Sequence, residues 1–424
     1  MFWIYGGGLS MGSIFQDMYN GSVLAATGDV VIVAANYRVG ALGFLYGADN
    51  SAPGNVGLYD QLLALKWVRD NAQAFGGDRD RITIFGESAG SMSVSAHVLS
   101  PLSSGQFRRA IMFSGSVMYN KDRPIIDTIE ALEKSKQKAK ELGCDPYDYH
   151  WLDCLRDISD PKLFKDPPVS NGLSSSIFPV IGTEFLPQLP QKAFELGQVN
   201  TDIDILSGTT THEGLSMALM LFPETMGSQL TVEQFTTILA KVDQSFHNLD
   251  IANITKYYLN NVDTTSVHDM RMALGDLMGD LFMVCPTFKF AKTFAQNSRN
   301  NNVYYYQLQY KAENSLSAPL DKALGLDASV VHHGSDIEFI FGIPLLKPEG
   351  YSELDYDFSL HVMQLISNFA KYGKPDNDWP KLLDTNSKDS IIVTKIRALT
   401  PHDLTSIIDN PFDSTCGDVW KYYF

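Results

Sequence analysis

The distribution of apolar residues along the chain predicts alternating strands and helices. Short, nearly unbroken apolar runs are typical of strands that are covered on both faces of a sheet. They lie at residues 2–5, 29–38, 81–86, 108–115, 202–208, 303–310 and 390–394. Segments with apolar residues on one side at helical spacing predict helices at 61–75, 91–100, 129–142, 231–242, 268–296 and 357–372.

The alternation of strands and helices indicates parallel βαβ units and therefore an α/β fold. No internal repeat or low-complexity linker divides the chain, so we expect a single domain spanning residues 1–424. The interval 212–300 contains mainly helical patterns and is expected to be an insertion in that domain. No stretch of roughly 18 consecutive apolar residues exists, so no membrane-spanning helix is predicted.

The chain is acidic, with 33 basic against 49 acidic side chains and a net charge of −16. Such a charge disfavours nucleic acid or an anionic membrane surface as a partner. The four cysteines permit two disulfides or four buried free thiols of a cytosolic enzyme, and no CxxC pair suggests a zinc or redox centre. Sequons at Asn20 and Asn253 weakly favour a secreted glycoprotein.

The segment ITIFGESAG contains the strongest chemical signal. Residues 86–90 match the pattern GxSxG, directly after a predicted strand and at the start of a predicted helix. This is the context of a nucleophile elbow, a sharp turn that projects Oγ of Ser88 above the sheet. Glycine at positions 86 and 90 lets strand and helix approach closely, and the helix N-terminus favours a developing negative charge.

Three consecutive glycines, Gly6, Gly7 and Gly8, follow the first predicted strand. An elbow serine needs an oxyanion hole, part of which is commonly a glycine-rich loop after an earlier strand. The backbone N–H groups of this run can converge on one oxygen, together with the N–H of Ala89. The two segments together indicate nucleophilic attack by Ser88 on a carbonyl group.

The sequence resembles the type B carboxylesterase and cholinesterase family of α/β hydrolases. The segments that carry the resemblance occur in the family's order and are WIYGGG, NYRVGALGFL, GNVGLYDQLLALKWV, FGGD, ITIFGESAG and FRRAI. The resemblance implies a central, mostly parallel sheet flanked by helices. In the family a longer segment precedes WIYGGG, so an N-terminally incomplete chain is expected.

The resemblance also implies the partners of Ser88. The segment VVHHGSDIEF matches the family's catalytic-histidine motif at His333, with His332 as the competing neighbour. The family's acid follows a strand in an EG dipeptide and is a glutamate, which places it at Glu213. Glu87 matches an acidic residue near the histidine. Ser114 and Asp60 match positions that support the site.

The implied reaction is hydrolysis of a carboxylic ester through an acyl-enzyme intermediate. His333 would accept the proton of Ser88, and Glu213 would orient the imidazole. Gly7, Gly8 and Ala89 would stabilise the oxyanion. No metal or organic cofactor is expected, and the expected partner is a small-molecule ester.

Positions at which cholinesterases recognise choline esters differ in this sequence. The acyl positions fall on Leu173 and Ser175, and the aromatic residues that follow the acid fall on Ser216 and Met217. Ring faces that bind quaternary ammonium are therefore missing at these positions. We expect a general carboxylesterase that acts on uncharged esters with a roomy acyl group.

The resemblance pairs the cysteines as Cys144 with Cys154 and Cys285 with Cys416. Both disulfides would require an oxidising compartment, so a secreted or extracellular location is expected.

Two other classes of protein share this fold. One is a cholinesterase-like adhesion protein, which typically lacks part of the triad. The other is a binding protein that is acylated once and turns over slowly, or an inactive truncated product.

Overall fold

The computed structural model describes residues 1–424 except 119–126, 165–178, 226–229, 247, 299, 325, 327–328 and 385–391. Its centre is a mostly parallel sheet in the order β11-β10-β8-β7-β6-β5-β1-β2, with β9 paired to β10. The strands are β1 (Phe2–Ile4), β2 (Val33–Ala34), β5 (Thr83–Glu87), β6 (Arg109–Phe113), β7 (Asp204–Thr210), β8 (Val303–Leu308), β9 (Leu383–Asp384), β10 (Val393–Leu399) and β11 (Ile407–Asp409). Only the pairs β9–β10 and β10–β11 of this described sheet are antiparallel.

The middle strands are fully buried, with apolar residues at their centres. Every residue of β5, β6 and β7 is buried. The register places Phe85 of β5 between Trp3 of β1 and Ile111 of β6. Burial of these side chains on both faces is the main stabilisation of a parallel sheet. The α/β-hydrolase architecture predicted from the sequence is confirmed.

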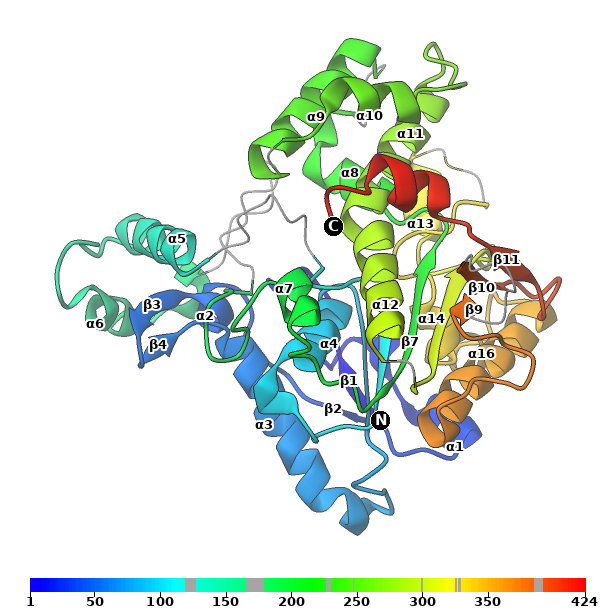
Figure 1. Ribbon diagram of the computed structural model, residues 1–424, viewed down its shortest axis with the longest axis horizontal. Coiled ribbons are helices and arrows are strands. Elements are labelled where there is room, and N and C mark those ends of the chain that lie inside the picture. Colours follow the sequence, from blue (N-terminus) through cyan, green and yellow to red (C-terminus); the bar gives the residue numbers. More distant parts are fainter. Residues whose placement is uncertain are drawn as a thin grey trace.

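Helices cover the sheet and extend beyond it, as Figure 1 shows. Helix α4 packs against β5 and β6, α12 packs against β7 and β8, and α1 packs against α16. The larger helices are α1 (Ser22–Gly28), α3 (Val56–Asn71), α4 (Ala89–Leu99), α5 (Thr128–Glu141), α6 (Trp151–Arg156), α7 (Pro190–Glu195), α8 (Leu215–Leu221), α9 (Val232–Phe246), α10 (Ile251–Tyr258), α11 (Val267–Gly279), α12 (Cys285–Asn297), α13 (Ala318–Leu324) and α16 (Glu353–Tyr372).

Predicted elements differ from the structure in three places. The strand predicted at 390–394 begins in residues outside the described ones and corresponds to β10, which runs from Val393 to Leu399. The strand predicted at 29–38 is reduced to the two residues of β2, which lies at the end of the described sheet and pairs only with β1. The helix predicted at 268–296 is divided into α11 and α12 by a π-helical segment, Asp280–Val284. Pro286 lies in the first turn of α12. Its lack of an N–H and the bulk of its ring prevent a continuous α-helix through this point.

The helical insertion is smaller than the predicted interval 212–300. Helices α8 to α11 lie between β7 and β8 in the sequence, and Figure 1 shows α9 and α10 far from the sheet. By contrast, α12 packs on β7 and β8. It is therefore the crossover helix between two parallel strands rather than part of the insertion.

Two disulfides join separate elements. Cys144–Cys154 links the end of α5 to α6, and Cys285–Cys416 links α12 to the C-terminal segment. The described residues contain no free cysteine. Both predicted pairs are therefore present, and the alternative of four free thiols does not apply.

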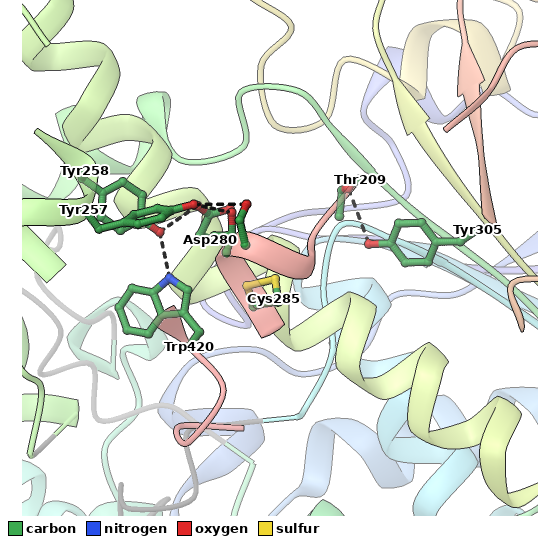
Figure 2. Close-up of a disulfide and its surroundings, with 10 residues drawn as sticks. Thr209, Tyr257, Tyr258, Asp280, Cys285, Tyr305 and Trp420 are labelled. Atoms are coloured by element: carbon green, nitrogen blue, oxygen red, sulfur yellow. Dashed lines mark hydrogen bonds between the residues drawn. A yellow bond between two sulfur atoms is a disulfide. The ribbon is translucent and has the colours of Figure 1, made fainter. Parts of the chain in front are cut away.

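A chain of polar contacts lies beside the second disulfide, as Figure 2 shows. Trp420 Nε1 donates to Tyr258 Oη at 2.7 Å, and Tyr258 Oη donates to Asp280 Oδ2 at 2.7 Å. The C-terminal segment is thereby attached to both α10 and the π-helical segment. Within the described residues, no helix combines the length and apolar character needed to cross a bilayer.

Candidate active site

Ser88 lies on a strained turn between β5 and α4. Its backbone has φ 56° and ψ −123°, a conformation that L-residues rarely adopt. Two hydrogen bonds maintain it: Ser88 N–H donates to Phe113 O at 2.9 Å, and Ser88 O accepts from Met92 N–H at 2.9 Å. This is the geometry that a nucleophile elbow requires.

Glycine is required on both sides of this turn. A Cβ on Gly90 would lie 2.0 Å from the carbonyl oxygen of Ile4, and a Cβ on Gly86 would lie 2.6 Å from the backbone of Gly90. Neither backbone contact can be relieved by a side-chain movement. The two glycines therefore let β1, β5 and α4 meet directly below Ser88.

The glycine run packs against the elbow. A Cβ on Gly6 would lie 3.0 Å from Cβ of Ser88. Gly7 and Gly8 have φ of 112° and 61°, in the region that favours glycine. Among the described residues, none accepts a hydrogen bond from the backbone N–H of Gly7, Gly8 or Ala89. The loop thus offers donors beside the candidate nucleophile.

Glu213 and His333 form a short contact. His333 Nδ1 lies 2.6 Å from Glu213 Oε2. The other oxygen of Glu213 accepts hydrogen bonds from Ser114 Oγ and the Thr210 backbone N–H, both at 2.5 Å. Glu213 is 1% exposed. Its carboxylate is therefore fixed by three partners and holds one ring nitrogen of His333.

The second ring nitrogen of His333 faces an acid rather than the serine. His333 Nε2 lies 3.2 Å from Glu87 Oε1. Within the described part of the chain this nitrogen has no hydrogen-bond partner, so no Ser88–His333 hydrogen bond is formed. Such contacts are often long or misaligned without substrate and tighten when substrate binds.

Buried carboxyl groups control the charge of His333. Burial itself lowers the pKa of His333, but the negative charges of Glu87, Glu213 and Asp336 outweigh it and raise the pKa to about 9. Burial raises the pKa of Glu87 to about 8 and that of Asp336 to about 6. Because Glu87 and His333 are so close, they titrate as a pair rather than independently.

The competing histidine lies elsewhere. His332 is buried, and its Nε2 contacts Asp321 Oδ1, while Asp321 Oδ2 contacts Lys311 Nζ. Of the two adjacent histidines, the one in contact with Glu213 is therefore His333. Asp321 and Lys311 were not identified from the sequence, because the contact depends on the path of the loop that carries α13.

The remaining predicted positions have different surroundings. Asp60 forms a two-pronged ion pair with Arg38, with both nitrogen–oxygen distances at 2.7 Å. Ser216 and Met217 lie in α8 and are half-buried. Leu173 and Ser175 lie outside the described residues. Among the residues that the structure describes, no three His, Cys, Asp or Glu side chains are grouped as metal ligands.

Asp336 is an additional acid of the site that the sequence analysis did not single out. Tyr306 Oη donates to Asp336 Oδ2 at 2.6 Å, and the charge of Asp336 acts on His333. A signal was available, since Asp336 lies three residues after His333 in the same motif. The direction in which the Asp336 side chain points could not be predicted from the sequence.

Comparison with known proteins places this geometry in context. The family model described as "Carboxylesterase family" matches residues 1–401. The chain is 35% identical to a cholinesterase of Mus musculus, covering 94% of this chain and 68% of the relative. It is 34% identical to an acetylcholinesterase of Leptinotarsa decemlineata (90% and 62%) and 32% identical to acetylcholinesterase-1 of Trittame loki (100% and 76%).

Proposed function

The chain belongs to the carboxylesterase family, and from this membership and the site geometry we propose that it hydrolyses carboxylic esters with Ser88 as nucleophile. One observation carries the proposal. Ser88 is held at positive φ against the glycine run, and the residue before it, Glu87, lies 3.2 Å from Nε2 of His333, whose Nδ1 contacts Glu213. The candidate nucleophile is therefore adjacent in sequence to a residue that contacts the candidate base, and this supports the assignment of both roles.

The reaction follows from these roles. Ser88 Oγ attacks the ester carbonyl carbon and transfers its proton to His333 Nε2. The oxyanion accepts hydrogen bonds from the N–H groups of Gly7, Gly8 and Ala89, each worth about 3 kcal/mol in the transition state. His333 then protonates the leaving alcohol. Water, deprotonated by the same nitrogen, releases the acid from Ser88.

Glu213 contributes orientation and charge. Its contact with His333 Nδ1 keeps the proton of the neutral imidazole on Nδ1, which leaves Nε2 free to accept. Ser114 and Thr210 saturate the other oxygen, so the carboxylate cannot rotate away. The negative charge of Glu213 then stabilises the imidazolium that forms during attack.

We further propose that the substrates are uncharged esters. Ser216 and Met217 follow the acid at the first turns of α8, and neither offers a ring face to a quaternary ammonium group. The curated relatives are named for choline esters. Choline esters are therefore the substrates against which neutral esters must be compared.

The direct test uses an alkyl fluorophosphonate probe and 4-nitrophenyl butyrate with the full chain. Wild type should be labelled and should turn over, and Ser88→Ala should do neither while keeping its circular dichroism spectrum. Labelling without turnover would indicate the slow-turnover class of binding protein. Absence of labelling in folded wild type would contradict the proposal and favour an adhesion role.

The two disulfides support a role in an oxidising, extracellular setting. Asn20 and Asn253 are both exposed in the structure, as glycosylation acceptors must be. Expression through the secretory pathway followed by treatment with an N-glycosidase tests this proposal. A protein that keeps the same mass after treatment would show that neither sequon is used.

A further inference from the structure

We infer that His212 and His332 are positioning residues that fasten the turn carrying Glu213 to the turn carrying His333. We call these two residues, with Asp321 and Lys311, the histidine clamp. The inference rests on the proposed function, because it assigns the clamp a role through His333. Each histidine of the clamp directly precedes the group that it positions.

The first half of the clamp joins the two turns through their backbones. His212 lies two residues after β7 and forms an isolated parallel bridge with His332, which follows α13. The backbone N–H of His212 donates to Val331 O at 3.0 Å, and the Val331 N–H donates to the His212 ring at Nδ1, also at 3.0 Å. The ring of His212 therefore acts as a hydrogen-bond acceptor for the base-bearing turn.

The second half of the clamp fixes the ring of His332. Asp321 lies between His332 Nε2 and Lys311 Nζ and contacts each with a different oxygen. The side chains of Lys311, Asp321 and His332 are 1%, 9% and 3% exposed. The two oxygens of Asp321 can thus accept one hydrogen bond from Lys311 Nζ and one from the N–H of His332 at Nε2. Lys311 follows β8 and Asp321 belongs to α13, so two elements hold one side chain.

This arrangement matters because the Glu213–His333 contact has little tolerance. It is 2.6 Å long and joins two turns that no strand pairing beyond the His212–His332 bridge connects within the described residues. A displacement of about 1 Å in a reacting group can cost about 100-fold in rate. A buried ion pair is weak as a source of stability, and holding geometry is the better-founded use for it here.

A matched pair of variants at His332 tests the second half. His332→Gln keeps an N–H near the position of Nε2 and should retain the contact with Asp321. His332→Met has a similar length without a donor. For 4-nitrophenyl butyrate we expect His332→Met to lower kcat about 10- to 100-fold with little change in KM, and His332→Gln to stay within about threefold of wild type.

The pH profile separates positioning from loss of fold. The charged groups that face His333 are Glu87, Glu213 and Asp336. Loosening the Glu213 contact weakens one of the interactions that raise the pKa of His333. The acidic limb of kcat/KM in His332→Met should therefore move to lower pH. A purely structural defect would reduce the amount of active enzyme and leave the midpoint of that limb unchanged.

Two further pairs keep the inference falsifiable if His332→Met does not fold. His212→Asn retains an acceptor near Nδ1 and should keep activity, whereas His212→Leu should lose it. The double variant Lys311→Met with Asp321→Leu removes both charges and also the acceptor of His332 Nε2, and it should behave like His332→Met. Labelling of wild type by the fluorophosphonate together with turnover of 4-nitrophenyl butyrate tests the proposed function independently of the clamp. If wild type is active and both donor-lacking and donor-keeping variants match it, the clamp has no positioning role.

Discussion

At the scale of single residues, the proton affinity of His333 depends on acids that surround it on several sides. Glu213 holds Nδ1, Glu87 faces Nε2, and Asp336 lies in the same loop. The negative charges of these acids raise the pKa of His333 to about 9, so a rise in pH favours the neutral imidazole that can accept the proton of Ser88. Activity should therefore rise as pH increases through the range in which the Glu87–His333 pair loses its proton.

Replacement of one acid tests this account. Glu87→Gln removes a negative charge that raises the pKa of His333, so the neutral base becomes available at lower pH. The acidic limb of kcat/KM should move down by about one to three pH units. The measurement is the pH dependence of 4-nitrophenyl butyrate hydrolysis. Glu195→Gln, which removes an exposed acid paired with Lys192, is the control and should leave the limb in place. An unchanged limb in Glu87→Gln would contradict the assignment of His333 as the titrating base.

Residues of the site differ in how far the sequence reveals them. Ser88 and its glycines form a local motif, so the strained turn could be predicted from five consecutive residues. Choosing His333 over His332 required the resemblance to a family. The two histidines are adjacent, so they have the same neighbours in the sequence and no local pattern distinguishes them. The contact of Glu87 with His333 and the role of Asp321 depend on side-chain directions across distant turns. No periodicity in the sequence encodes those directions.

At the scale of elements, the elbow is a contact between three backbones. Gly90→Ala would bring a methyl group to 2.0 Å from Ile4 O, and β1 and α4 would have to separate. We expect a loss of at least about 1–3 kcal/mol in the free energy of unfolding. Urea denaturation followed by fluorescence measures it. Gly417→Ala is the control, since its new Cβ would meet nothing closer than 3.9 Å. Equal stability of the two variants would contradict the close approach.

The C-terminal segment is attached by more than its disulfide. Tyr258→Phe removes a hydroxyl that accepts from Trp420 and donates to Asp280, as Figure 2 shows, and it leaves the buried indole N–H without that acceptor. The expected cost is about 1–3 kcal/mol. Tyr257→Phe is the matched control, because Tyr257 lies half-buried and, among the described residues, its hydroxyl forms hydrogen bonds with Ser414 and Thr415. Thermal unfolding under non-reducing conditions should rank Tyr258→Phe below Tyr257→Phe. The reverse order would show that solvent replaces the Tyr258 contacts.

Elements were predictable where one pattern dominates. Helices α5 and α16 have one apolar side and were expected within about four residues of their observed bounds. Helix α3 begins five residues before its predicted start. The π-helical segment before α12 was not expected, because an apolar pattern continues across it and only Pro286 marks the interruption. The strand predicted at 29–38 was too long. The apolar run suggested a strand inside the sheet, but β2 has a strand partner on one side only within the described sheet.

At the scale of the whole molecule, alternating elements predicted a parallel sheet but not its order. β7 and β8 are neighbours although the helices from α8 to α12 separate them in the sequence. The pairing of β7 with β8 brings together residues that are far apart in the sequence, and composition does not specify which strands pair. It is nevertheless decisive for the site, because Glu213 follows β7 and the turn of His333 docks beside it. The acid and the base are thus brought together by strand order.

The charge of the whole molecule enters the choice of substrate. A net charge of −16 attracts a cation such as choline over long distances, and this attraction fades with added salt. A dedicated choline site acts at contact distance and persists in salt. We expect kcat/KM for acetylcholine and butyrylcholine to fall as ionic strength rises. At high ionic strength it should lie below the kcat/KM of a neutral ester of similar size. The missing ring faces at Ser216 and Met217 correspond to about 0.5–2 kcal/mol, or up to about thirtyfold.

A single substitution tests the contact part of this argument. Met217→Phe places a ring in α8 after Glu213 and should raise kcat/KM for choline esters at high salt by up to about thirtyfold relative to neutral esters. Met217→Leu adds no ring and should change neither preference nor salt dependence. The measurement is kcat/KM for acetylcholine, butyrylcholine and 4-nitrophenyl butyrate at low and high ionic strength. If wild type prefers acetylcholine strongly and salt does not weaken that preference, a cation site exists without these rings. The protein would then have to be regarded as a cholinesterase rather than a general carboxylesterase.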